Sequence, residues 1–221
     1  MPMRDGNSGR YPGYDVLAKR NTPSWNEPTR RAIDARLSVP EEPRYFTEEE
    51  WATLSAVCKR IVPQPSDRPP IPVAALVDSK LHTDARDGYR FAKLPRMQEA
   101  WKRGLRALDE EARQAHGVAF HELSAECQDA LLRRAEGGDL HHPSWGGMPS
   151  DLFFRARLLR DVVQAYYSHP IAWSEIGFGG PASPRGYVRM GFDRRDPWEA
   201  AEVKGGDLEK AHEANRLVGR R

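Results

Sequence analysis

The stretch TEEEWATLSAVCKRIVP, residues 47–63, decides the fold class because it carries a complete set of helix signals. Thr47 followed by Glu50 predicts a capping box, in which each side chain accepts a hydrogen bond from a backbone N–H of the first turn. The acidic residues 48–50 suit the positive end of the helix dipole. Apolar side chains then recur at helical spacing until a proline ends the run, at Trp51, Leu54, Cys58, Ile61 and Pro63. The sequence therefore predicts an amphipathic α-helix here.

Four further segments repeat this combination of helix start, apolar stripe and helix stop. We expect helices over residues 72–81, 95–115, 124–137 and 150–166, with Ser124 and Ser150 as N-caps of the last two. Residues 28–37 and 208–218 carry weaker helical patterns. Sustained alternation of apolar and polar residues, the mark of a strand, is almost absent. The predicted fold is all-α, a small irregular helical domain of about five helices.

The two ends of the chain differ in composition from the middle. Residues 1–44 are rich in Gly, Pro, Arg and Asn, and residues 186–221 mix glycine, arginine and acid. Neither end has enough apolar residues to form a core alone. We therefore expect an extended N-terminal arm over 1–44, a helical domain over 45–185 and a C-terminal tail over 186–221. The scattered aromatics of the arms fit two alternatives, anchors for a partner or staples onto the chain's own body.

Charge and hydropathy set limits on partners and location. The 34 basic and 32 acidic residues give a net charge of +2 and are interspersed, which argues against a nucleic-acid footprint. We find no apolar run long enough to span a membrane. Residues 1–20 lack the apolar region of a secretory signal, so we expect a cytoplasmic protein, with export alongside a partner as the alternative.

The cysteines and histidines do not have the spacing of a metal site. Cys58 and Cys127 lie in predicted helices and form no Cys-x-x-Cys pair, so we expect two apolar thiols, and a disulfide stays open. His141 and His142 stand in a Gly/Pro loop, and His169 precedes a proline. A small metal-assisted hydrolase that uses His141, His142 or His169 is the main alternative function.

Other catalytic patterns are absent as well. We find no Gly-x-Ser-x-Gly elbow and no Gly-x-Gly-x-x-Gly loop after a strand. The carboxylates of residues 109–111 lie among Lys and Arg on a predicted helix, which indicates ordinary surface charges. These observations favour an interaction protein over an enzyme.

Tryptophan and tyrosine are concentrated in loop-like sequence instead. These side chains are the usual anchors of protein interfaces because they bury much area at little entropic cost. Internal packing of long loops is the alternative explanation. The predicted partner-binding residues are Tyr11, Tyr14, Trp25, Trp145, Tyr167, Trp173, Phe178, Tyr187 and Trp198.

Three segments carry a family resemblance. They are YFTEEEWATLSAVCKRIVP (45–63), FHELSAECQDALLRRAEGG (120–138) and FFRARLLRDVVQAYYSHPIAWSEIGFGGP (153–181). In this order they resemble the gluconate 2-dehydrogenase subunit 3 family, whose pattern ends in Tyr-Ser-x-Pro and Trp-x-x-Ile-Gly-Phe. Two common family features are missing: a Gly-Gly-Asn-rich loop between Pro170 and Trp173, and an N-terminal twin-arginine signal.

The resemblance implies a non-catalytic small subunit. Members of the family are helical proteins without a cofactor that bind and stabilise a large dehydrogenase subunit, and that partner carries FAD and oxidises a sugar or sugar derivative. A cytochrome subunit is a further partner that the resemblance allows. A scaffold module for an unrelated partner is the remaining alternative.

Overall fold

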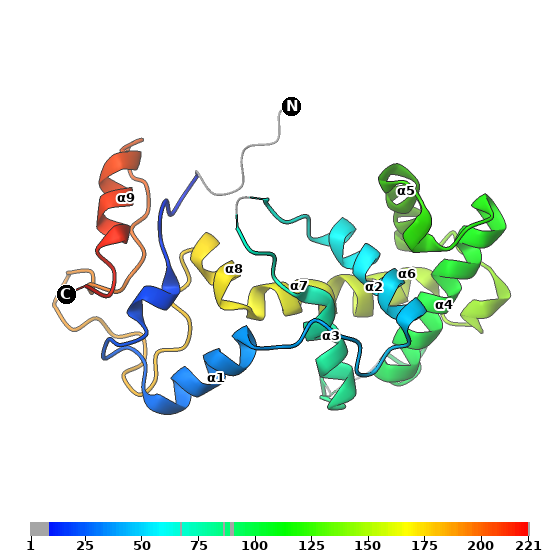
Figure 1. Ribbon diagram of the computed structural model, residues 1–221, viewed down its shortest axis with the longest axis horizontal. Helices are drawn as coiled ribbons and strands as arrows, with labels where there is room; N and C mark the ends of the chain where they lie inside the picture. Colours follow the sequence, from blue (N-terminus) through cyan, green and yellow to red (C-terminus); the bar gives the residue numbers. More distant parts are fainter. Residues whose placement is uncertain (1–8, 67, 86, 89–90, 221) are drawn as a thin grey trace. The chain divides into compact units, whose positions relative to one another are not determined.

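The computed structural model describes residues 9–66, 68–85, 87–88 and 91–220. These residues form α-helices joined by turns and short 3₁₀ segments, without a strand among them, and the all-α prediction is confirmed (Figure 1). No helix in the described part of the chain has the length and apolar character needed to cross a membrane. The helices are α1 (Glu27–Leu37), α2 (Glu48–Ile61), α3 (Val73–His82), α4 (Met97–His116), α5 (Ala125–Gly137), α6 (Ser150–Phe153), α7 (Arg160–Ser168), α8 (Pro170–Glu175) and α9 (Leu208–Arg216).

The helix ends follow the local chemistry of the sequence in most places. Thr47 and Glu50 form the predicted capping box at the start of α2. Ser124 caps α5, and Gly138 ends it in the left-handed conformation that glycine adopts without strain. The predicted cap at Ser150 is wrong, because Ser150 is already the first residue of α6 and Pro149 precedes it.

The helix predicted over residues 150–166 is not a regular α-helix. A π-helical segment, η4 (Phe154–Leu159), separates α6 from α7. The prediction also missed α8, which starts at Pro170. Proline at the first helical position is favourable because its missing N–H would have no partner there.

The chain forms two compact units. Unit 1 consists of residues up to Ser38, Pro65–Ile71 and Tyr167 onward, and unit 2 consists of Val39–Gln64 and Pro72–Tyr166. This division differs from the predicted arm, domain and tail. The N-terminal segment, the C-terminal segment and the end of the predicted helical domain belong to one unit.

Unit 1 has a hydrophobic core of its own, built from segments far apart in the sequence. The Asn215 side chain joins them: it donates hydrogen bonds to the carbonyls of Pro12 and Ala201 and accepts one from the Ala201 N–H. The Val16 N–H donates to the Ser174 hydroxyl at 3.1 Å. The buried core consists of Tyr14, Val16, Trp25, Ile33, Trp173, Trp198 and Val218. Each segment is too poor in apolar residues to fold alone, but together they bury several aromatic rings.

Unit 2 is a helical cluster around α2 and α4. Helix α2 packs against α3, α4 and α5. The rings of Trp101 and Trp145 both lie edge-on to Phe153, with centroid distances of 5.8 and 5.7 Å. Burial of such aromatic side chains is the main stabilising contribution in a helical unit of this size.

Two acidic residues of α4 contradict the prediction of ordinary surface charges. Asp109 is buried and accepts hydrogen bonds from the Thr53 hydroxyl and the Phe120 N–H. Glu111 is buried and accepts from the His142 N–H at 2.7 Å and from the Trp145 indole at 3.1 Å. Both carboxylates therefore fasten loops onto α4, a role that depends on partners far away in the sequence.

Gly104 in the middle of α4 packs directly against the Phe153 ring. A Cβ atom at this position would lie 2.1 Å from Cζ of Phe153. Alanine is the better helix former by about 1 kcal/mol, but the Phe153 ring is fully buried between two tryptophans and cannot move aside. We expect Gly104→Ala to lower the free energy of unfolding by about 1–3 kcal/mol, measured by urea denaturation.

The matched background for this test is Phe153→Leu, which removes the far end of the ring. In that background Gly104→Ala should be neutral or stabilising, because only the helix preference remains. An equal loss of stability in both backgrounds would show that the contact with Phe153 is not the cause.

Candidate partner-binding surface

The structure separates the predicted partner-binding aromatics into two groups. Tyr14, Trp25, Trp145, Trp173 and Trp198 are buried within their own units. A side chain that is buried in its own chain has little surface left for a partner, so internal packing accounts for these five. The residues that keep accessible surface are Tyr11, Tyr167, Phe178 and Tyr187.

Exposed apolar side chains are concentrated in one segment of unit 1, residues 187–192, which we call the apolar segment. Tyr187 is 72% exposed, and Phe192 is fully exposed. Val188 and Met190 between them are also largely exposed. A soluble chain rarely leaves adjacent large apolar side chains in water unless they contact another surface. The sequence predicted Tyr187 as a partner-binding residue but did not point to Val188 and Met190, because aliphatic residues in a loop carry no distinct pattern.

Ion pairs hold the apolar segment in place. Arg185 donates to the carbonyl of Val188, and its guanidinium also pairs with Asp196 at 2.9 Å. Arg189 pairs with Glu199 at 2.9 Å. The Met190 N–H donates to the Asp196 carboxylate. The exposure of the segment is therefore a property of a fixed loop conformation.

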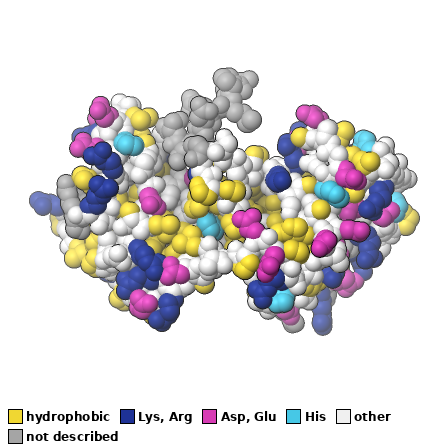
Figure 2. All heavy atoms as spheres, viewed as in Figure 1, with side chains coloured by type: hydrophobic (Ala, Val, Ile, Leu, Met, Phe, Trp, Pro, Cys, Tyr) yellow, Lys and Arg dark blue, Asp and Glu magenta, His cyan; other side chains and the backbone are white. Residues whose placement is uncertain are grey.

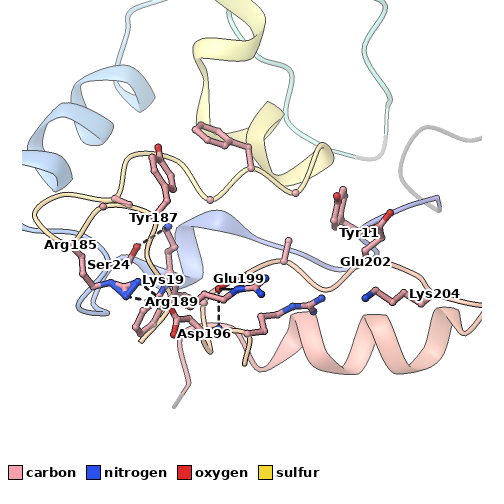
Figure 3. A pocket seen from close by; sticks show the side chains of 18 residues that line it. Tyr11, Lys19, Ser24, Arg185, Tyr187, Arg189, Asp196, Glu199, Glu202 and Lys204 are labelled. Atoms are coloured by element: carbon pink, nitrogen blue, oxygen red, sulfur yellow. Dashed lines mark hydrogen bonds and ion pairs between the residues drawn. The ribbon is translucent and has the colours of Figure 1, made fainter. Parts of the chain in front are cut away.

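A groove with a volume of about 640 Å³ lies beside this segment, within unit 1. Tyr11, Phe178 and Tyr187 line it together with charged side chains of both signs (Figure 3). Its cationic lining residues are Lys19, Arg185, Arg189, Arg195 and Lys204, and its acidic ones are Asp196, Glu199 and Glu202.

Lys19 has the most unusual environment in the groove. It is the last residue of the 3₁₀ helix η1 (Val16–Lys19), and its side chain is only 2% exposed. The Nζ atom donates to the Ser24 hydroxyl at 3.1 Å and lies 5.1 Å from the centre of the Trp25 ring. Burial lowers the pKa of Lys19 to about 8, and the nearby charge of Arg185 acts in the same direction. Nothing in the local sequence DVLAKR distinguishes this lysine from a surface lysine.

His169 is a helix cap in this structure. It is buried, it is the N-cap residue of α8, and its Nδ1 accepts a hydrogen bond from the Ile171 N–H. Burial, with the charges of Arg68 and Arg36, lowers the pKa of His169 to about 4. The imidazole is therefore neutral at physiological pH, and a base this weak does little proton transfer there.

The other two histidines of the hydrolase alternative lie in unit 2. His142 caps the short 3₁₀ helix η3 (Pro143–Trp145), and its Nδ1 accepts from the Ser144 N–H. His141 and His142 both line a small cavity of about 360 Å³. Among the described residues, no three His, Cys, Asp or Glu side chains come together in a way that could hold a metal ion.

Cys58 and Cys127 are free thiols, and burial raises the pKa of Cys58 to about 12.

The charged side chains on the face in view are mixed in sign (Figure 2). On the face in view, Figure 2 shows Lys and Arg side chains beside Asp and Glu side chains rather than a patch of one sign. This arrangement agrees with the interspersed charges of the sequence.

Comparison with known proteins agrees with the three resembling segments. A family model described as gluconate 2-dehydrogenase subunit 3 matches residues 48–180. No curated protein and no solved structure matches the chain significantly. The matched residues include α2 to α8, whereas Lys19 and the apolar segment lie outside the match. Since the match covers more than half of the 221 residues, the chain belongs to the gluconate 2-dehydrogenase subunit 3 family.

Proposed function

We propose that this protein is a non-catalytic small subunit that binds and stabilises a large FAD-dependent dehydrogenase subunit acting on a sugar or a sugar derivative. Family membership supports a subunit of a dehydrogenase complex. The chain contributes binding surface, and the hydride transfer from the sugar to FAD takes place in the partner.

The observation that carries this proposal is the exposed apolar segment of unit 1. Four of its six residues, Tyr187, Val188, Met190 and Phe192, are exposed apolar side chains, with Arg189 and Gly191 between them. Aromatic, Met and Arg side chains are the types enriched at the centre of protein interfaces. Exposed Tyr167 and Phe178 in the same unit add to the surface that a partner can cover.

Co-expression with a flavoprotein encoded next to this protein tests the proposal. We expect both chains to elute together in size-exclusion chromatography, with flavin absorbance in the shared peak and dehydrogenase activity that depends on co-expression. A haem band in that peak would identify a cytochrome subunit as well. Elution as a separate chain that binds metal and hydrolyses substrates on its own would contradict the proposal.

Substitution of the apolar segment locates the interface. We expect Met190→Ser combined with Phe192→Ser to weaken binding of the flavoprotein at least tenfold, because such anchors contribute about 1–3 kcal/mol each. The control is Val118→Ser, which changes an exposed apolar side chain of unit 2. Titration by surface plasmon resonance measures both variants, and equal affinities for them would place the interface elsewhere.

A further inference from the structure

We propose that the Lys19 end of the groove is a binding site for a small carboxylate anion. The site belongs to unit 1 and is built mainly from residues outside the family match, so the family does not imply it. It also stands independently of the dehydrogenase partner, because the binding that it predicts is measured on this chain alone.

Among the residues that the structure describes, Lys19 is buried without a neutralising carboxylate beside it. Lysine side chains are almost never buried unless an opposite charge accompanies them. In the described residues, Lys19 has no carboxylate within ion-pair distance, and its polar contacts are the Ser24 hydroxyl and the Trp25 ring. The acidic residues of the groove already have arginine partners: Asp196 pairs with Arg185, Glu199 with Arg189 and Glu202 with Arg10. The ammonium group therefore lacks the anion that its burial requires.

Further hydrogen-bond donors lie near Lys19. Because the Ser24 oxygen accepts from Lys19, its hydroxyl hydrogen remains available to donate. The Nε–H of Arg185 is buried and has no acceptor in the described structure. Figure 3 shows Lys19, Ser24 and Arg185 together at one end of the groove. One ammonium, one hydroxyl and a nearby guanidinium suit a monoanion with two acceptor oxygens, which is a carboxylate.

Gly179 places no side chain against the Lys19 ammonium group. A Cβ atom on Gly179 would lie 3.2 Å from Nζ of Lys19, so any side chain at this position would crowd the ammonium group. Gly179 does not adopt the left-handed backbone conformation that requires glycine, and alanine can replace it without backbone strain. The missing side chain leaves room in front of the amine.

Titration of the full chain with sodium acetate, against sodium chloride at equal ionic strength, tests this site. We expect acetate to raise the melting temperature saturably, since a ligand of the native state stabilises it. Lys19→Met should weaken acetate binding at least tenfold, and Gly179→Ala should weaken it by crowding the amine. Lys204→Met, which removes another cation of the groove, is the matched control and should bind acetate like the unsubstituted protein.

The pH dependence gives a second measurement. Acetate is ionised throughout the neutral range, so the protonation of Lys19 decides its affinity. The groups that face Lys19 are Arg185, which disfavours its charge, and Glu199, which favours it. With the pKa of Lys19 near 8, affinity should be nearly constant from about pH 6, where acetate is still ionised, to pH 8, and fall about tenfold per pH unit above it. An affinity that stays constant between about pH 7 and pH 10 would show that Lys19 does not hold the anion.

Two sources of the carboxylate are distinguishable in the same assay. If the complex with the flavoprotein no longer binds acetate, an acidic group of the partner occupies the site; if it still binds acetate, the ligand is a small molecule. Equal responses to acetate and chloride, or undiminished acetate binding by both Lys19→Met and Gly179→Ala, would overturn the proposal. Neither result would affect coelution with the flavoprotein.

Discussion

Replacing Asp78 with alanine should lower the free energy of unfolding of unit 2 by about 3–5 kcal/mol, since a buried donor left without an acceptor costs about 1–3 kcal/mol. Asp78 lies on α3 and is 1% exposed. Its carboxylate accepts from three consecutive backbone N–H groups, those of Arg44, Tyr45 and Phe46, at 2.9–3.2 Å.

These hydrogen bonds fix the chain just before the capping box of α2. Without Asp78, three amide groups lose their acceptor, and the Phe46 ring, which lies edge-on to Trp101 at 6.4 Å, loses its anchor. Asparagine keeps one acceptor oxygen and turns a donor toward the amides, so Asp78→Asn should fall between alanine and the native residue.

Urea denaturation followed by circular dichroism measures this effect. The matched control is Glu136→Ala, which removes an exposed carboxylate from α5 of the same unit. We expect it to change stability by no more than about 0.5 kcal/mol. A loss below 1 kcal/mol in Asp78→Ala would mean that water replaces the carboxylate without cost.

Asp161→Ala should destabilise unit 2 by a similar amount, about 3–5 kcal/mol, because it breaks a buried ion cluster. Asp161 is 2% exposed and accepts from Lys80 at 3.1 Å and from the Trp101 indole at 2.8 Å. Asp87 pairs with Lys80 and with Arg157, each at 2.9 Å. Removal of Asp161 leaves three cations, Lys80, Arg157 and Arg160, with one carboxylate, that of Asp87, and it leaves the Trp101 indole N–H without its acceptor.

The double variant Asp161→Ala with Lys80→Met separates charge imbalance from lost packing. Lys80→Met removes one of the cations left in excess, so it should recover at least about 1 kcal/mol of the loss, a coupling typical of neighbouring charges. The same urea denaturation measures it. Strictly additive losses would show that the cluster does not act as a unit.

The helices of this protein are largely predictable from local sequence. The capping box of Thr47 and Glu50, the Ser124 cap and the Gly138 stop depend on atoms within one helical turn. Helix α4 begins and ends within two residues of its predicted limits for the same reason. The π-helical segment and α8 were missed, because neither has an apolar period of its own over enough residues.

The candidate site was only partly predictable. Sequence alone identified Tyr187 and Phe178 as partner-binding residues, and both remain accessible. It gave Trp25, Trp173 and Trp198 the same role, although they form the core of unit 1. A tryptophan in a loop has the same sequence appearance whether it faces a partner or its own chain, so its burial cannot be read from composition.

By itself, the sequence determined the all-α class, most of the helix limits and the family, because these depend on residues near each other in the chain. Only the tertiary structure decided that the two ends of the chain form one unit, and that Lys19, Asp78 and Asp161 are buried. The physical reason is that burial and hydrogen bonding of these side chains come from segments distant in sequence. The burial and the hydrogen bonds of a lysine or an aspartate depend on those neighbours, and the local sequence pattern does not identify them.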